Sequence, residues 1–114
     1  MSQGISLIIY PVTDIAQAKT LYQEFLGVEP VMDEPYYVHF QIGDQQIGLD
    51  PNGHKKGMTG PVGYREVDDI KASLQRLLDV GAQSQQDVQD VGGGKLTALV
   101  KDASGNVIGL TQAS

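Results

Sequence analysis

The stretch Val100–Thr111, with the sequence VKDASGNVIGLT, predicts a β-hairpin and with it the fold of the chain. Its two strands flank a turn at residues 103–106, where Gly and Asn can adopt the positive φ angles that tight turns need. A similar hairpin occurs earlier, with a turn centred on Gly43-Asp44. The tripeptide Ile-Gly-Leu lies in the returning strand of both, at residues 47–49 and 108–110. Two similar hairpins in a short chain indicate an internal duplication.

The first half of the chain combines one helical pattern with several strand patterns. Ile5–Val12 is apolar on both faces, as in a strand covered on both sides. Thr13 or Asp14 can cap a helix that ends at Gly27. We expect a buried stripe on this helix and three strands after it. The stripe is Ile15, Ala18, Tyr22 and Phe25 with Leu21 and Leu26 beside it, and the strands are Pro30–Asp33, Tyr36–Ile42 and Gln46–Asp50.

The second half repeats this order. Val62–Val67 predicts a strand, and Asp68 or Asp69 can cap a helix that runs to about Val80. The final strands lie further from the helix than in the first half, which predicts a longer loop around Asp87–Gly94. We therefore expect one α+β domain over residues 1–114, built from module 1–53 and module 60–114 and joined by a Gly- and Pro-rich linker around residues 51–61.

Composition excludes several classes of partner. A net charge of −6 argues against binding to nucleic acid or to an anionic membrane, because both need clustered Lys and Arg. The chain has no cysteine, so disulfides and thiolate metal sites are excluded and a cytoplasmic location is expected. The apolar run at the N-terminus is too short for a signal peptide or a transmembrane span.

The order, spacing and duplication of these motifs resemble the vicinal oxygen chelate superfamily, which includes glyoxalase I, bleomycin-resistance proteins and extradiol dioxygenases. The residues that carry the resemblance are Val12-Thr13-Asp14-Ile15, Tyr22, Leu26-Gly27, Val67-Asp68-Asp69-Ile70, Gly81-Ala82 and the stretch from Asp102 to Leu110. Ala103 stands where the family hairpin usually has Pro. The resemblance implies a cup-shaped mixed sheet made by two βαβββ modules. In metal-dependent members, His or Glu side chains there hold one divalent ion.

The positions that the resemblance assigns to metal ligands are Leu7, Gly48, Val62 and Gly109. None of these residues has a metal-binding side chain, and a shift of one residue along any strand does not supply a set of ligands. The chain has only two histidines. We therefore expect no metal site and no cofactor.

The first hairpin places polar side chains on the face away from the helix. With the turn at Gly43-Asp44, His39 lies opposite Gly48, and an aromatic and amide-rich surface results. His39 and Glu66 are weak candidates for acid–base catalysis, while a solvated His and a capping Glu are the simpler interpretations. The cluster His54-Lys55-Lys56 could attract an anion, while a solvated loop is the simpler interpretation. The candidate ligand pocket comprises Leu7, Tyr37, His39, Gln41, Gln46, Gly48, Asp50, Val62, Tyr64, Glu66 and Gly109.

Three functional hypotheses follow. The first is a metal-free protein that binds a small organic molecule in the cup, for which the bleomycin-resistance proteins are the precedent within the resemblance. The second is a lyase, isomerase or dioxygenase, either metal-free or with a metal at non-standard ligands such as His39, Asp50 and Glu66. The third is a structural or interaction domain without a ligand. We also expect a homodimer, because each module alone would expose a sheet edge.

Overall fold

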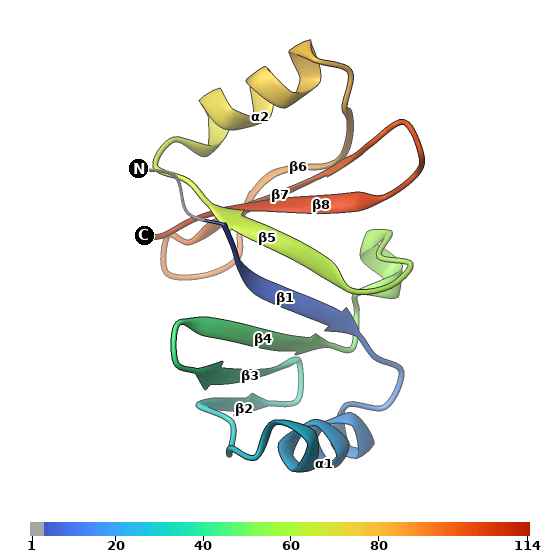
Figure 1. Cartoon of the computed structure of the whole chain (residues 1–114), viewed down its shortest axis with the longest axis vertical. Helices are drawn as coiled ribbons and strands as arrows, with labels where there is room; N and C mark the ends of the chain where they lie inside the picture. Colours follow the sequence, from blue (N-terminus) through green and yellow to red (C-terminus); the bar gives the residue numbers. More distant parts are fainter. Residues whose placement is uncertain (1–3) are drawn as a thin grey trace. The chain divides into compact units, whose positions relative to one another are not determined.

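The computed structural model describes residues 4–114 and divides into two compact units. The N-terminal unit is Ser6–Val62, and the C-terminal unit is Gly63–Ser114 together with residues 4 and 5. Each follows the order strand, helix, strand, strand, strand, so the predicted α+β fold with two βαβββ repeats is confirmed (Figure 1). The elements are β1 (Ile5–Pro11), α1 (Ile15–Leu26), β2 (Met32–Glu34), β3 (Tyr37–Ile42), β4 (Gln45–Asp50), η1 (His54–Lys56), β5 (Val62–Glu66), α2 (Ile70–Asp79), β6 (Gln83–Asp90), β7 (Leu96–Lys101) and β8 (Val107–Gln112).

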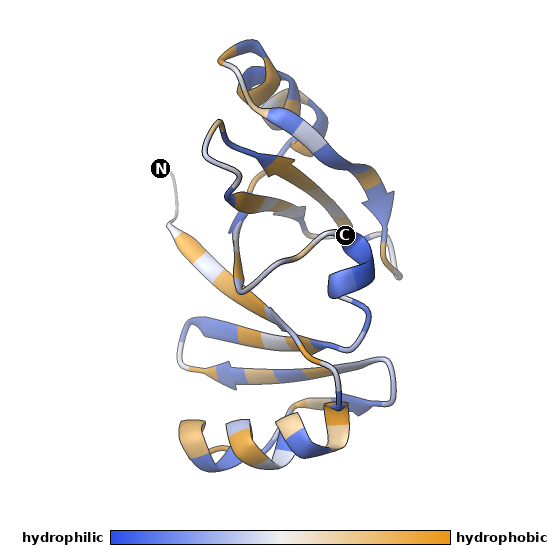
Figure 2. Cartoon of the chain, turned by 90° about the vertical axis from the view of Figure 1, so that its right-hand side faces the viewer, coloured by the Kyte–Doolittle hydropathy of each residue, from blue (hydrophilic) through white to orange (hydrophobic). Residues whose placement is uncertain are grey.

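The sheet of the N-terminal unit has the strand order β2-β3-β4-β1. β1 runs parallel to β4, whereas β3 is antiparallel to both β2 and β4. The first hairpin has the predicted register, with Phe40 opposite Ile47 and His39 opposite Gly48. Side chains alternate in hydropathy along β3 and β4 (Figure 2), so one face of the sheet is apolar and packs against α1. The buried residues of this face are Val38, Phe40, Ile47 and Leu49.

Helix α1 begins and ends where the sequence predicts. The Asp14 carboxylate caps it by accepting a hydrogen bond from the Gln17 amide at 3.0 Å, and Gly27 stops it in the left-handed conformation at φ 72°. The predicted buried stripe is wrong in part. Phe25 is 75% exposed and Leu21 is exposed too, while Ala18, Tyr22 and Leu26 pack on the sheet. The apolar arc of α1 is therefore wider than the strip that the sheet covers.

The C-terminal unit has the strand order β5-β8-β7-β6, with β5 parallel to β8 and the other pairs antiparallel. Asp69 caps α2 by accepting a hydrogen bond from the Ala72 amide at 3.1 Å. The helix packs its apolar side on one face of the sheet. The buried residues of that core are Val67, Ile70, Leu74, Ala98, Val100 and Leu110.

Two segments differ from the sequence expectation. Residues 87–90, predicted to begin a loop, belong to β6, and the turn occupies only the residues that follow. The reason is that β6 is an edge strand of polar residues with irregular register, so the apolar alternation that identifies a strand is missing. The segment after β4 contains the turn η1 and buries Gly53 and Met58, which makes it more ordered than its Gly- and Pro-rich composition suggests.

No helix formed by residues 4–114 has the length and apolar character needed to cross a membrane.

Candidate functional site

The helix-free face of the N-terminal sheet brings together most of the predicted pocket residues of the first half. Strand pairing aligns Leu7 with Gln46 on β1 and β4, and His39 with Gly48 on β3 and β4. Paired residues share a face, so these side chains form one surface on the side of the sheet away from α1. Ile9, which pairs with Gly48, belongs to this surface as well. Gln41 lies at its margin, where its side-chain amide donates a hydrogen bond to the Gly43 carbonyl in the turn.

Gly48 is buried beneath the ring of Tyr37. A Cβ atom at Gly48 would overlap the Tyr37 hydroxyl and would lie 2.7 Å from Cζ of the ring. The backbone of Gly48 is not in the positive-φ region, so glycine is required here by the close approach of the ring and not by the backbone conformation. Tyr37 thus occupies the space that a larger side chain at position 48 would need.

Tyr37 and His39 form a hydrogen-bonded pair on this surface. The Tyr37 hydroxyl lies 3.0 Å from Nδ1 of His39, and the two rings are tilted with their centroids 5.7 Å apart. Burial, and to a smaller extent the nearby carboxylate of Asp50, raises the pKa of the Tyr37 hydroxyl above its ordinary value of 10.0. Burial therefore favours the neutral hydroxyl over the phenolate.

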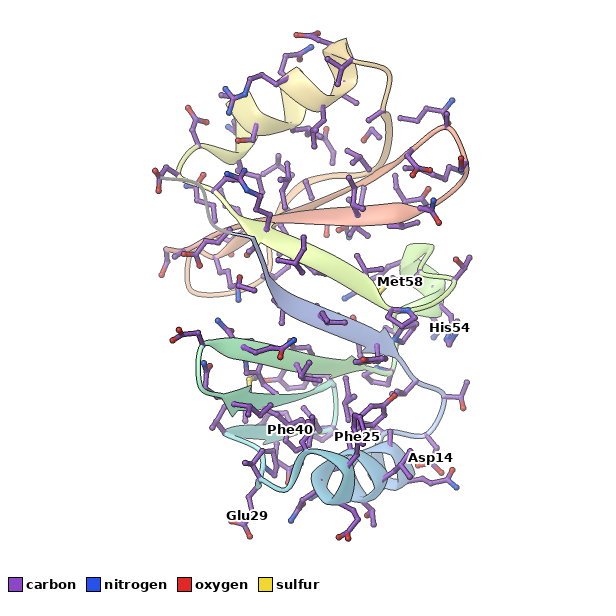
Figure 3. All side chains as sticks on the ribbon, viewed as in Figure 1. Asp14, Phe25, Glu29, Phe40, His54 and Met58 are labelled. Carbon is purple, nitrogen blue, oxygen red and sulfur yellow. The ribbon has the colours of Figure 1, made fainter. Side chains whose placement is uncertain are left out.

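Asp50, at the end of β4, is a buried carboxylate with only 4% of its surface exposed. One oxygen accepts a hydrogen bond from the backbone amide of Asn52 at 2.8 Å, and the other accepts from Nζ of Lys56 at 2.7 Å. The cation comes from η1, within the turn segment that also holds His54 and Met58 (Figure 3). Lys56 is therefore not simply a solvated loop residue, since it neutralises a buried charge.

The C-terminal sheet has a corresponding but much less polar face. Val62, Tyr64 and Glu66 alternate along β5, and Tyr64 and Glu66 pair with Gly109 and Thr111 of β8. A Cβ atom at Gly109 would overlap the Tyr64 ring and would lie 2.8 Å from its Cγ. Both glycines at presumed ligand positions are thus covered by a tyrosine, although the tyrosines come from different strands of their sheets.

Matching the two sheets on Gly48 and Gly109 shows how they differ. The residue opposite the glycine is His39 in the first sheet and Leu99 in the second. The residue two places after the glycine is Asp50 in the first and Thr111 in the second. Thr111 is 3% exposed, and its hydroxyl has no hydrogen-bond partner. At these matched positions the first sheet therefore has ionisable side chains and the second has none.

The candidate residues of the two halves have different surroundings. On the first sheet Tyr37, His39, Gly48 and Asp50 come together around one short network. On the second sheet Val62, Tyr64 and Gly109 are buried, whereas Glu66 is exposed at the end of β5.

Sequence reasoning missed Ile9, Leu99, Thr111 and the pairing of Lys56 with Asp50. The signal that could have found Lys56 is a buried acidic residue at the end of a strand, which requires a cation nearby in the chain. The signal for Thr111 is its spacing of two from Gly109, which places it on the same face of β8.

The family model of the Glyoxalase/Bleomycin resistance protein/Dioxygenase superfamily matches residues 4–110. The chain belongs to this superfamily. No curated protein sequence matches the chain.

Several solved structures share the glyoxalase-like fold. One is a Legionella pneumophila protein named as an NAD-dependent benzaldehyde dehydrogenase, with a TM-score of 0.78, 14% identity and coverage of 95% of this chain and 98% of that one. A superfamily member from Vibrio splendidus 12B01 has a TM-score of 0.71, 15% identity and coverage of 94% and 97%. Methylmalonyl-CoA epimerase from Mycobacterium tuberculosis has a TM-score of 0.71, 18% identity and coverage of 99% and 89%. At these identities the likeness extends to the fold alone.

The residues of this glyoxalase-like chain at the family's ligand positions cannot bind the metal ion that metal-dependent members hold. The four presumed ligand positions are Leu7, Gly48, Val62 and Gly109, whose side chains are apolar or absent. Tyr37 and Tyr64 fill the space into which a ligand at either glycine would extend. Among residues 4–114, no three His, Cys, Asp or Glu side chains gather closely enough to hold a metal ion.

Proposed function

We propose that this superfamily member binds a small organic molecule without a metal ion, on the helix-free faces of its sheets. The observation that carries the proposal is the pairing of each glycine at a ligand position with an overlying tyrosine. This pairing excludes a larger ligand side chain at either position and leaves aromatic and hydrogen-bonding groups in its place. Such groups suit recognition of an organic molecule by packing and hydrogen bonds.

The first test is metal dependence. Protein purified without added metal is analysed for Zn, Ni, Mn and Fe, and its thermal unfolding is followed with and without EDTA. We expect less than stoichiometric metal and a Tm that EDTA leaves unchanged. Stoichiometric metal whose removal abolishes an activity would refute the proposal.

The second test is ligand binding. A thermal-shift library is screened with the wild-type chain and with His39→Ala, because His39 lies at the centre of the polar face. We expect hits whose stabilisation is reduced in the variant. A library in which no compound stabilises the wild type would favour the hypothesis of an interaction domain without a ligand.

A metal-free enzyme is the second candidate, favoured by the hydrogen bond between Tyr37 and His39. A histidine oriented by a protonated tyrosine can transfer a proton to or from a bound substrate. Glu66, the other catalytic candidate, is exposed and lies in the other unit. An assay of the library hits for turnover, comparing wild type with His39→Ala, separates binding from catalysis.

Assembly and location remain predictions. We propose a homodimer, and the exposed apolar side chains of Leu21 and Phe25 on α1 support a contact with a second copy. Light scattering coupled to size exclusion tests this, and a single species of 12.2 kDa would refute it. A cytoplasmic location and the lack of nucleic-acid or membrane partners are likewise proposed.

A further inference from the structure

The polar groups of the N-terminal sheet differ in how far they reach solvent. Asp50 is buried, and each of its two oxygens already accepts one hydrogen bond. Lys56, by contrast, has 41% of its side-chain surface exposed, and Tyr37 and His39 are half-buried. The Asp50 carboxylate, which accepts hydrogen bonds, is therefore shielded from a ligand. The side chains that a ligand can reach are those of Lys56, Tyr37 and His39.

Asp50 also fixes the position of the Lys56 ammonium. An unpaired surface lysine samples many rotamers, and ordering it on binding is costly in entropy. Here the contact of 2.7 Å with a buried carboxylate holds Nζ in place before a ligand arrives. An ammonium group has three N–H donors, and Asp50 uses one of them. The Lys56 ammonium is thus held in position and still has N–H donors for a ligand.

The same carboxylate links Lys56 to the Tyr37–His39 pair. Tyr37 and Asp50 are the next residues beyond the Val38–Leu49 pair on β3 and β4, so they share a face, and the Tyr37 hydroxyl contacts His39 at 3.0 Å. The corresponding face of the C-terminal sheet offers Leu99 and Thr111 in the places of His39 and Asp50. The matched positions of the C-terminal sheet therefore lack both the carboxylate that holds Lys56 and the histidine that contacts Tyr37.

From this arrangement we propose that the ligand is an organic acid whose carboxylate binds at the N-terminal sheet, with Lys56 and the Tyr37 hydroxyl as its donors and with His39 Nδ1–H donating in turn to the Tyr37 oxygen. The inference rests on the proposed function, since it names the class of molecule bound at that site. A carboxylate fits because it has two acceptor oxygens and a charge opposite to that of Lys56, and hydrogen bonds between charged groups are the stronger kind. An amide of the same shape carries no charge and has only one acceptor oxygen.

The experiment compares acids with their amides as probes. Benzoate and benzamide form one pair and hexanoate and hexanamide another, with Kd measured by ligand-observed NMR. We expect the wild type to bind at least one acid about tenfold more tightly than its amide, as charge-assisted hydrogen bonds are roughly twice as strong as neutral ones. Lys56→Met should reduce that preference about tenfold, and Lys55→Met should leave it within about twofold.

Lys55→Met is the matched control, because it removes the same charge from the same turn and Lys55 is exposed. If Lys56→Met fails to fold, Tyr37→Phe keeps the ring over Gly48 and removes only the hydroxyl donor. It should lower acid affinity about fivefold and lower amide affinity less, since a hydrogen bond to a charged group is stronger than one to a neutral group.

Equal affinity for acids and amides, or equal effects of the two lysine variants, would overturn this inference. Binding of other library compounds but of neither acid would do the same and leave the proposed function standing. Absence of binding by every probe and every library compound would remove the proposed function as well.

Discussion

Replacing Gly48 by Ala directly tests the role of the tyrosine above it. The added Cβ would overlap the Tyr37 hydroxyl and lie 2.7 Å from Cζ. Carbon atoms in contact are ordinarily about 3.5–4.0 Å apart, so the ring must move by roughly 1 Å. Such a displacement would lengthen the bond of 3.0 Å to His39 beyond hydrogen-bonding range.

The expected loss of stability combines two effects. Overpacking a well-packed site costs about 1–3 kcal/mol, and loss of the hydrogen bond costs about 1 kcal/mol. The free energy of unfolding should fall by about 2–4 kcal/mol. For a chain of this length, roughly 4 °C in Tm accompanies each kcal/mol, so Tm should fall by about 8–16 °C. Urea denaturation followed by far-UV circular dichroism measures the change, because the chain has no tryptophan.

Gly60→Ala is the matched control. A Cβ at Gly60 would meet no heavy atom within 4 Å, and the backbone there is not in the positive-φ region. This variant should change stability by less than about 0.5 kcal/mol or raise it slightly. In a Tyr37→Ala background, Gly48→Ala should cost almost nothing more, because the obstructing ring is gone. If Gly48→Ala were as stable as Gly60→Ala, the argument from the tyrosine ring would fail.

Further predictions concern the C-terminal unit. Thr111→Val should leave the free energy of unfolding unchanged or raise it by up to about 1 kcal/mol, because a buried hydroxyl without a partner is replaced by a methyl group. If urea denaturation showed a loss of more than about 1 kcal/mol, the hydroxyl would have to be hydrogen-bonded. Hydrogen bonds from the Asn106 side chain and backbone lower the pKa of Asp102 below its ordinary value of 3.8. The stabilisation is present above that pH and is lost as the pH falls through the lowered pKa, so the Tm difference between wild type and Asp102→Ala should shrink in acid. A difference that is constant from pH 7 to 2 would contradict this. Ala103→Pro, which restores the usual residue of the family hairpin, should stabilise by about 0.4–1 kcal/mol in the same assay, and destabilisation would show that the turn cannot accept Pro.

The fold was predictable because its local signals agree with one another. Asp14 and Asp69 cap the helices, and Gly27 ends the first at a positive φ, as their residue types indicate. The register of the first hairpin follows from the turn at Gly43-Asp44, which sets every pair along it. These features depend on residues close together in sequence.

What could not be predicted depends on how much of an element its neighbours cover. The apolar stripe of α1 includes Phe25, yet the sheet is too narrow to cover it. β6 lies at an edge and contacts the core through Val88 alone among its side chains that are apolar, so its sequence shows no apolar alternation. The pairing of Lys56 with Asp50 requires a turn whose path composition alone does not specify.

The contact between Gly48 and Tyr37 also constrains how the chain can evolve. A mutation that introduces Glu or His at position 48 in one step would place the new side chain against the tyrosine ring and destabilise the protein before any ion could bind. A smaller residue at position 37 would have to arise first, and by itself it would leave a gap. A ligand side chain at position 48 alone thus requires two substitutions, at positions 37 and 48, in a fixed order. The same steric barrier exists independently at Gly109 and Tyr64.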